Sequence, residues 1–395
     1  MRTVFPITVV GLACLLYLGT LRGGFVWDDV PLIAENPVLR NLGNLPRALA
    51  SDFSGMADPS RRSGYYRPVT VLTYFLDYHI WRGRPSGFHL SNVLLHALCS
   101  LSVYLLSLKV LGSREAALTA GLLFAAHPVH TEAVAWISGR TDILSALFLL
   151  AALLTADRAY GLSLMLSALS MGAKESGTSA VLLAPLYRVL YVDQTVRRCI
   201  GYILVGAGFW GLRWASIGRI HLHPETLAPP LHLRIADVPL LWGKYVGKLL
   251  WPFQLNAEWE VAASGHLGFR HLVAWGVLGC TVYWFLRRWR KNPAFALGLG
   301  LLFLGLLPVS GIVPLYDRVA ERFLYLPSAG FALVGAWGWT FVLHRRRTLA
   351  WTLLSGVLLV YSWGTVHRNR IWKDQETLFR TTVQDAPGSA RAHYN

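Results

Sequence analysis

The amino-acid sequence predicts an all-α protein that crosses a membrane many times, and three observations support this prediction. First, 54% of the 395 residues are hydrophobic and only 15% are charged, whereas a soluble domain has about 25% charged residues. Second, the apolar residues are grouped in blocks that contain no Asp, Glu, Lys or Arg. Third, the longest blocks match the roughly 17 to 25 residues that a helix needs to cross a bilayer.

Eleven apolar runs are the predicted transmembrane helices. Five are long, at 4–21, 88–108, 292–316, 323–343 and 348–366. Six shorter ones lie between them, at 116–131, 143–156, 159–173, 176–187, 199–212 and 271–286. The first run could also be a signal peptide, but no small-x-small cleavage site precedes Asp28, so we expect an uncleaved span. The fold class is therefore a bundle of about 11 transmembrane helices.

The basic loops set the expected orientation, because short loops rich in Lys and Arg stay on the cytoplasmic side. The clearest are RRWRK at 287–291 and RRR at 345–347. If both are cytoplasmic, three segments lie on the periplasmic or lumenal side, namely 22–87, 127–140 and 213–269. The stretch 237–253 would reverse the basic loops if it crossed the membrane, so we expect it to be interfacial or re-entrant.

The net charge of +16 does not indicate a nucleic-acid-binding protein, because no recognition helix, zinc finger or aromatic RNA motif accompanies it. Basic loops and arginines that face anionic lipid headgroups account for the charge. The four cysteines lie in apolar segments without motif spacing, so we expect neither a disulfide framework nor a cysteine metal site. Membrane lipids are thus expected partners, and nucleic acids are not.

The first outer segment contains two adjacent carboxylates, Asp28 and Asp29, in the stretch GGFVWDDVPLIAENP. A carboxylate beside the end of an apolar helix can act as a general base if a substrate hydroxyl comes within hydrogen-bond reach. An isolated Asp-Asp pair is also typical of a solvated loop or a helix cap, and the residues alone leave this alternative open.

Four cations are expected on the same outer side of the membrane and are candidates for binding an anionic group. They are Arg67 in YYRPVT, Arg140 in HPVHTEAVAWISGRTD, Lys174 in AKESG and Arg322 in DRVAERFLYLPS. Arginine can bind a phosphate through two parallel hydrogen bonds.

Two of these cations have a carboxylate next to them in the sequence, Glu175 beside Lys174 and Glu321 beside Arg322. Adjacent residues do not face each other on a helix. We therefore expect these four side chains to find their partners elsewhere in the protein.

Several histidines accompany the charged residues. His89, Asn92 and His96 are spaced i, i+3 and i+7 and share one helix face, which must contact protein or water. His96 fits an interhelical hydrogen bond, whereas His89, at the outer end, is a candidate for orienting a substrate. Tyr325, one turn after Arg322, is a further candidate for this role.

The stretch HPVHTE contains His127, His130 and Glu132, which are residue types that bind zinc. Their spacing matches no strong metal-binding pattern. They could instead bind a phosphate or orient a base. An outer surface with carboxylates, cations and histidines above apolar helices suits a substrate with an anionic head and an apolar tail, such as a lipid-linked sugar phosphate.

A set of motifs resembles the transmembrane and tetratricopeptide-repeat (TPR) O-mannosyltransferases, a family of GT-C class glycosyltransferases. The motifs occur in the family's order over nearly the whole chain, and the resemblance is weakest in 190–300. They are FVWDD…AENP, YRPVTVLTYFLDY, GFHLSNVLLHAL, LLFAAHPVHTEAVAWISGRTDIL, KESGTSAVLL, AERFLYLPSAGFAL and RNRIWKDQETLFR…ARAHYN.

The resemblance implies a GT-C-like transferase domain over residues 1–366, with 22–87 as its first extracytoplasmic loop. It implies that 367–395 is a helical linker to a TPR region that is truncated or missing in this sequence. The implied reaction is transfer of mannose from a polyprenyl-phosphate donor to Ser or Thr of secretory proteins. The implied location is a bacterial inner membrane or the endoplasmic reticulum membrane. The family's catalytic acidic motif falls on Asp28 and Asp29.

The expected mechanism is an inverting transfer in which one of the two aspartates takes the proton from the acceptor hydroxyl. Arg67, Arg140, Lys174 and Arg322 are expected to stabilise the departing phosphate. The residues expected to orient the substrates or the base are His89, His127, His130, Glu132, Glu175, Glu321 and Tyr325. We expect no metal and no other cofactor, although the HPVHTE stretch leaves a divalent metal open.

Two other functions remain as alternatives to the transferase. A transporter would place ionisable residues near the middle of its spans, whereas here they lie at span ends. A non-catalytic scaffold that displays a TPR domain would tolerate neutralisation of Asp28 and Asp29.

Overall fold

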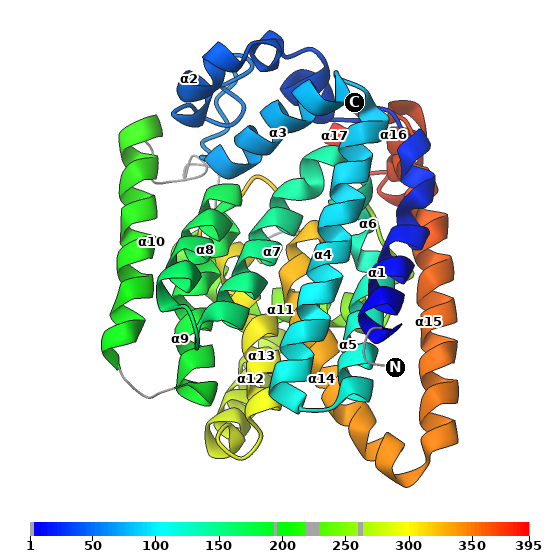
Figure 1. The fold of residues 1–395 in the computed structure, drawn as a ribbon. Coiled ribbons are helices and arrows are strands. Elements are labelled where there is room, and N and C mark those ends of the chain that lie inside the picture. The colour runs from blue at the N-terminus through cyan, green and yellow to red at the C-terminus, as the bar shows by residue number, and fades with distance from the viewer. Residues whose placement is uncertain (1–3, 193–195, 219–228, 260–263, 395) are drawn as a thin grey trace.

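The computed structural model describes residues 4–192, 196–218, 229–259 and 264–394, and these residues form helices and loops with no strand among them. Figure 1 shows the longer helices running side by side, with the N-terminal end of α1 (Val4–Tyr17) at one end of the bundle and the C-terminus at the other. The predicted all-α class is confirmed.

Each of the eleven predicted runs falls on a separate helix. These helices are α1, α4 (Pro85–Leu111), α5 (Arg114–Ala126), α7 (Arg140–Thr155), α8 (Tyr160–Ala173), α9 (Ala180–Tyr191), α10 (Val196–Ile217), α12 (Phe269–Arg288), α13 (Pro293–Leu306), α14 (Tyr325–Arg345) and α15 (Arg347–Asn369). The remaining helices are α2 (Leu45–Leu49), α3 (Pro68–Trp81), α6 (Thr131–Ala135), α11 (Leu231–Leu250), α16 (Gln375–Asp385) and α17 (Ala390–Tyr394).

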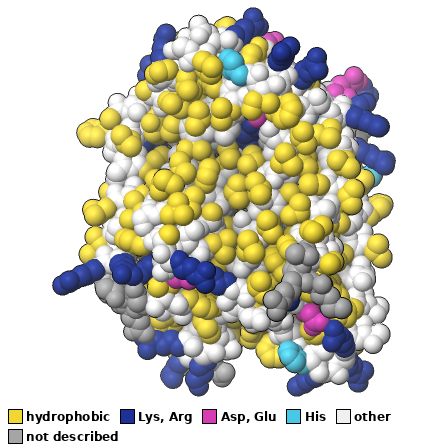
Figure 2. All heavy atoms as spheres, viewed as in Figure 1, with side chains coloured by type: hydrophobic (Ala, Val, Ile, Leu, Met, Phe, Trp, Pro, Cys, Tyr) yellow, Lys and Arg dark blue, Asp and Glu magenta, His cyan; other side chains and the backbone are white. Residues whose placement is uncertain are grey.

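Seven helical segments among the described residues are long and apolar enough to cross a bilayer. They are Val4–Arg22, Pro85–Leu111, Ile137–Thr155, Arg197–Ile217, Phe269–Arg287, Glu321–Arg345 and Arg347–Trp372, and Tyr160–Ala173 and Pro293–Val309 are shorter apolar helices. Figure 2 shows hydrophobic side chains over the middle of one face, with Lys and Arg gathered toward its two ends. The chain is a multi-pass membrane protein, and the total of about 11 spans stays a prediction.

The stretch 237–253, expected to be interfacial or re-entrant, lies in α11 and the residues that follow it. Its position relative to the membrane stays a prediction. The larger outer segment 213–269 lies partly outside the described residues.

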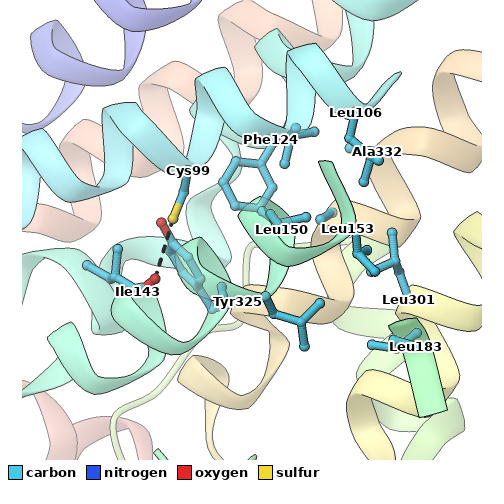
Figure 3. Packing of buried hydrophobic residues seen from close by; sticks show 14 of the residues in the cluster. Cys99, Leu106, Phe124, Ile143, Leu150, Leu153, Leu183, Leu301, Tyr325 and Ala332 are labelled. Atoms are coloured by element: carbon cyan, nitrogen blue, oxygen red, sulfur yellow. Dashed lines mark hydrogen bonds between the residues drawn. The ribbon is translucent and has the colours of Figure 1, made fainter. Parts of the chain in front are cut away.

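The helices pack closely because small residues lie where two backbones meet. A Cβ atom on Gly330 of α14 would lie 2.3 Å from the carbonyl oxygen of Gly298 in α13, so these helices approach each other with no room for a side chain. Around this contact, α4, α5, α7, α9, α13 and α14 share one apolar core. Figure 3 shows part of it, with the Cys99 thiol donating to the carbonyl oxygen of Ile143 at 3.4 Å.

Two of the predicted outer segments, 22–87 and 127–140, come together at one end of the bundle. Figure 1 shows α2, α3, α16 and α17 at this end. Hydrogen bonds link the first loop to two other segments, because Asp29 accepts from Ser138 and the backbone N–H of Tyr66 donates to Glu175. This end therefore places residues that are far apart in the sequence around a common space.

Candidate active site

A cavity of about 1360 Å³ lies among these loops and extends between α9, α10 and α13. Its polar wall contains four cations and three carboxylates, namely Arg62, Arg67, Lys174, Arg322, Asp28, Glu175 and Asp317. On the side of the helices its wall is apolar and includes Val181, Leu182, Trp210, Leu304, Leu307 and Val309. The cavity thus combines a charged end and an apolar end.

The structure separates the roles of the two adjacent aspartates. The Asp28 side chain is exposed and lines the cavity, whereas Asp29 is fully buried. Asp29 Oδ1 accepts hydrogen bonds from the backbone N–H and the hydroxyl of Ser138, at 2.8 and 2.6 Å. Its Oδ2 accepts from the backbone N–H of Val26 at 3.2 Å. Asp28 is therefore the aspartate that a substrate in the cavity can reach.

The environment of Asp29 raises the pKa of its carboxyl to about 7, and burial is the main cause. The hydrogen bonds from Ser138 and Val26 favour the charged form and lower the pKa, but the desolvation penalty is larger. Asp29 has no direct contact with the cavity, and its role in the geometry is to anchor the segment that carries Asp28.

The polar face of α4 contacts protein, as its spacing predicted. His89, Asn92 and His96 are all fully buried. His89 Nε2 lies 3.3 Å from the carbonyl oxygen of Gly24, and His96 Nδ1 lies 2.7 Å from the hydroxyl of Tyr325. His89 and Tyr325 are therefore packing partners of the loop and the helix bundle, and neither lines the cavity.

Two of the cavity cations, Arg67 and Lys174, are paired with carboxylates that are distant in the sequence. Arg67 Nε lies 3.0 Å from Glu175 Oε2, and Lys174 Nζ lies 2.6 Å from both carboxylate oxygens of Asp142. The expectation that Lys174 and Glu175 find separate partners is confirmed. Burial lowers the pKa of Lys174 to about 8, partly opposed by the charge of Asp142.

Arg322 makes the most extensive contacts of these cations. Its guanidinium pairs with Glu132 and Asp317, and its backbone N–H donates to Glu132 Oε2 at 2.8 Å. The guanidinium also lies 5.4 Å from the ring centre of Trp136. Glu321 pairs instead with Arg368 at 2.9 Å. Both residues therefore have partners away from their sequence neighbour, as predicted.

The structure does not bring Arg140 to the cavity. Its guanidinium is fully buried, donates to Asp77 Oδ2 at 2.6 Å and donates to the carbonyl oxygen of Phe88 at 3.0 Å. This ion pair joins α7 to α3 and directs the side chain away from a substrate.

The HPVHTE stretch is likewise buried in the packing. His127 Nε2 lies 3.0 Å from the carbonyl oxygen of Leu249, and His130 Nε2 lies 2.7 Å from the hydroxyl of Ser328. Within the described part of the chain, no group of three or more His, Cys, Asp or Glu side chains has an arrangement that could hold a metal ion. Glu132 forms an ion pair with Arg322, which lines the cavity, whereas the two histidines do not line it.

Several cavity residues were not predicted from the sequence. Ser138 and Trp136 lie in a quoted motif, but nothing marks a serine or a tryptophan there as functional. Asp317 is the first residue of another quoted motif, where its residue type alone does not distinguish it. Arg62 lies in the first loop among polar residues and has no distinguishing signal.

Comparisons with known proteins complete the description of the site. Neither a family model nor a solved structure matches the chain. Curated relatives do match over almost the whole chain. Protein O-mannosyl-transferase TMTC3 of Homo sapiens is 29% identical over 98% of this chain and 48% of its own length. Protein O-mannosyl-transferase TMTC4 of Homo sapiens is 28% identical over 98% of this chain and 62% of its own.

Protein O-mannosyl-transferase Tmtc1 of Drosophila melanogaster is 29% identical over 96% of this chain and 57% of its own length. The chain thus spans about half to three fifths of the length of these relatives. The resemblance seen in the motifs is confirmed, since over nearly its whole length the chain is similar to proteins that are named protein O-mannosyl-transferases.

Proposed function

We propose that the chain is a membrane glycosyltransferase that moves a sugar from a polyprenyl-phosphate donor to a Ser or Thr hydroxyl of a protein. The names of its relatives support mannose as the sugar. The observation that carries the proposal is the cavity, in which the exposed carboxylate of Asp28 faces the same space as four cations and an apolar wall. In this assignment residues 1–366 form the transferase domain and 367–395 a helical linker.

Asp28 is the general base in this reaction. Its carboxylate takes the proton of the acceptor hydroxyl as the oxygen forms a bond to the anomeric carbon of the sugar. The bond from that carbon to the phosphate oxygen breaks, and its electron pair leaves with the lipid phosphate. A single displacement from the opposite face inverts the anomeric configuration and needs only one base.

Three paired cations stabilise the charge that develops on the leaving phosphate. Arg67, Lys174 and Arg322 are held in place by Glu175, Asp142 and Glu132. Donors that are fixed before the reaction need no reorganisation when charge develops, which makes them effective in a water-poor site. In this mechanism the three cationic side chains stabilise the charge on the phosphate, and no metal is required.

The apolar wall accounts for the lipid part of the donor. Val181 and Leu182 come from α9 and Leu304 from α13, which are apolar helices of the membrane bundle. A polyprenyl chain along these helices would place its phosphate beside the cations and its sugar beside Asp28. In the proposed orientation this end of the bundle lies on the extracytoplasmic side, where the protein acceptor arrives.

A transfer assay with the whole chain tests the proposal. The purified protein in lipid receives radiolabelled polyprenyl-phosphate mannose and peptides that contain Ser and Thr. We expect label on the peptides, with inversion of the anomeric configuration between donor and product. Asp28→Asn should abolish transfer. Asp58→Asn, which removes a half-exposed carboxylate from the same loop, is the matched control and should retain it.

Two results would contradict the proposal. Transfer by Asp28→Asn at the wild-type rate would place the base elsewhere, with Glu175 and Asp317 as the other carboxylates that line the cavity. Folded wild-type protein that transfers no label under any donor or acceptor condition would instead favour the non-catalytic scaffold.

A further inference from the structure

The segment that carries Asp28 has an unfavourable backbone conformation. Trp27 has φ 54, in the left-handed region that a residue with a bulky side chain rarely adopts. The chain folds back at this point, because the N–H of Asp29 donates to the carbonyl oxygen of Val26 at 3.0 Å. Asp28 therefore lies at the tip of a tight turn. A conformation of this kind persists only where surrounding contacts enforce it.

The first of these contacts is made by the side chain of Trp27. Its ring stacks on that of Trp136 with the ring centres 5.1 Å apart and the planes 20° from parallel. Trp372 stacks on Trp136 with the centres 6.0 Å apart, and the edge of Phe379 meets Trp27. The residue before Asp28 is thus held in an aromatic stack.

The second contact is made by the residue after Asp28. Both oxygens of Asp29 accept hydrogen bonds, and Oδ1 accepts two from Ser138. Trp136 and Ser138 are separated by one residue, Ile137, which is fully buried. Residues 136–138 therefore contact both neighbours of Asp28, one through a stacked ring and the other through a serine.

Residues 136–138 are themselves fixed to the bundle. The side-chain amide of Asn92 in α4 donates to the carbonyl oxygens of Trp136 and Ile137, at 3.1 and 3.2 Å. The next residue, Gly139, approaches α6 so closely that a Cβ atom there would lie 2.6 Å from the carbonyl oxygen of Ala133. The position of the segment is thus set by α4 and α6.

We propose that residues 136–138 position Asp28 in the cavity by holding both of its neighbours, Trp27 against Trp136 and Asp29 against Ser138. This inference rests on the proposed function, in which Asp28 is the base. Trp27, Asp29 and Ser138 are positioning residues, and they act on the reaction only through the placement of the Asp28 carboxylate.

Ser138→Ala gives the most specific test, because it removes the hydroxyl donor and leaves the backbone N–H bond to Asp29. We expect kcat for transfer to fall about 10- to 100-fold, as for other small displacements of a reacting group, with the KM for the donor unchanged. Ser138→Thr keeps the hydroxyl and should restore most of kcat. Ser60→Ala, an exposed serine of the first loop that does not line the cavity, is the matched control.

Trp27→Gly tests the other contact. Glycine adopts φ 54 without strain, so this variant loses the stacked ring while the turn stays accessible. We expect a loss of kcat with the donor KM retained. Trp27→Phe keeps an aromatic ring and should lose less, and it serves as the second variant if Trp27→Gly does not fold.

A double variant separates positioning from an independent role. If Ser138 acts only through Asp28, then Ser138→Ala should cause no further loss in an Asp28→Asn background. A further loss in that background, an unchanged kcat in both Ser138→Ala and Trp27→Gly, or an effect on donor KM alone would overturn the positioning role. Wild-type transfer by Asp28→Asn would overturn the proposed function itself, so the two failures are distinguishable.

Discussion

The buried carboxyl of Asp29 should contribute less to the stability of the protein at pH 8 than at pH 5. In the unfolded chain this group loses its proton near pH 4, whereas the folded protein retains it until the pH reaches about 7. Between these values the folded state binds more protons than the unfolded state. The contribution of Asp29 to the free energy of unfolding therefore falls as the pH rises through this window, and the loss is complete above pH 7.

The size of the effect follows from the two pKa values. A rise from 3.8 to about 7 corresponds to about 4 kcal/mol, at about 1.36 kcal/mol for each pH unit. Asp29 is fully buried, so solvent does not screen this cost. Of this total, about 3 kcal/mol should be lost between pH 5 and pH 8.

Asp29→Asn should remove this pH dependence. The amide oxygen can still accept from Ser138, but the amide nitrogen faces the N–H of Val26, which loses its acceptor. That mismatch costs about 1–3 kcal/mol at every pH. The variant should thus show a lower stability at pH 5 and a nearly flat contribution from this site up to pH 8.

The assay is chemical unfolding of the purified protein in detergent micelles at pH 5 and pH 8. The quantity compared is the change in unfolding free energy between the two pH values, in wild type and in each variant. Asp58→Asn is the control, because Asp58 is half-exposed and hydrogen bonds from Ser60 hold the pKa of its carboxyl below the ordinary value, outside the window. If the unfolding free energy of Asp29→Asn changes between pH 5 and pH 8 by the same amount as that of wild type, the raised pKa of the buried Asp29 carboxyl is refuted.

Three further predictions concern the cavity and its support. Lys174→Met leaves Asp142 buried without its cation, and the free energy of unfolding should fall by about 3–5 kcal/mol in the same assay. A loss below about 1 kcal/mol would contradict the ion pair between Lys174 and Asp142. Gly139→Ala forces the backbone away from Ala133 and should lower both the melting temperature and the rate of sugar transfer. A variant with wild-type values for both would show that the close approach of Gly139 to Ala133 is not required. Arg62→Gln removes an exposed cavity cation and should raise the donor KM roughly fivefold, about 1 kcal/mol, without changing the melting temperature. An unchanged KM would exclude contact between Arg62 and the donor phosphate.

The membrane helices were predictable because lipid leaves a chain few choices. An uncharged run such as 88–108 must satisfy its backbone hydrogen bonds internally, so composition and length suffice to predict a helix. The pairing of Lys174 and Glu175 with separate partners was predictable for a similar reason, because the side chains of adjacent residues point in different directions in helical and in extended backbone. Both inferences depend only on local chemistry.

The different positions of Asp28 and Asp29, one at the cavity and the other buried, were not predictable from the sequence. They arise from the left-handed turn at Trp27 and from Ser138, which is distant in the sequence and close in the fold. Arg140 illustrates the opposite case, in which a residue predicted for the site does not line the cavity. Its residue type and its motif favoured phosphate binding, but Asp77 pairs with it inside the bundle. A motif predicts which residues are near a site, whereas long-range contacts decide which of them face it.

The motif HPVHTE shows how residue type alone can mislead. Imidazole and carboxylate groups are common metal ligands, yet His127 and His130 lie against a backbone carbonyl and a serine in the described structure. Glu132 forms an ion pair with Arg322, which lines the cavity, and does not line the cavity itself.

The chemical step at Asp28 is the most direct test of the proposed mechanism. The measurement is the single-turnover rate of sugar transfer from bound polyprenyl-phosphate mannose to peptide, in wild type and Asp28→Asn, together with the donor Kd of each. A general base contributes about 10²- to 10⁴-fold, so we predict a loss of that size in the rate with the Kd unchanged and the melting temperature retained. A single-turnover rate in Asp28→Asn equal to that of wild type would contradict the account.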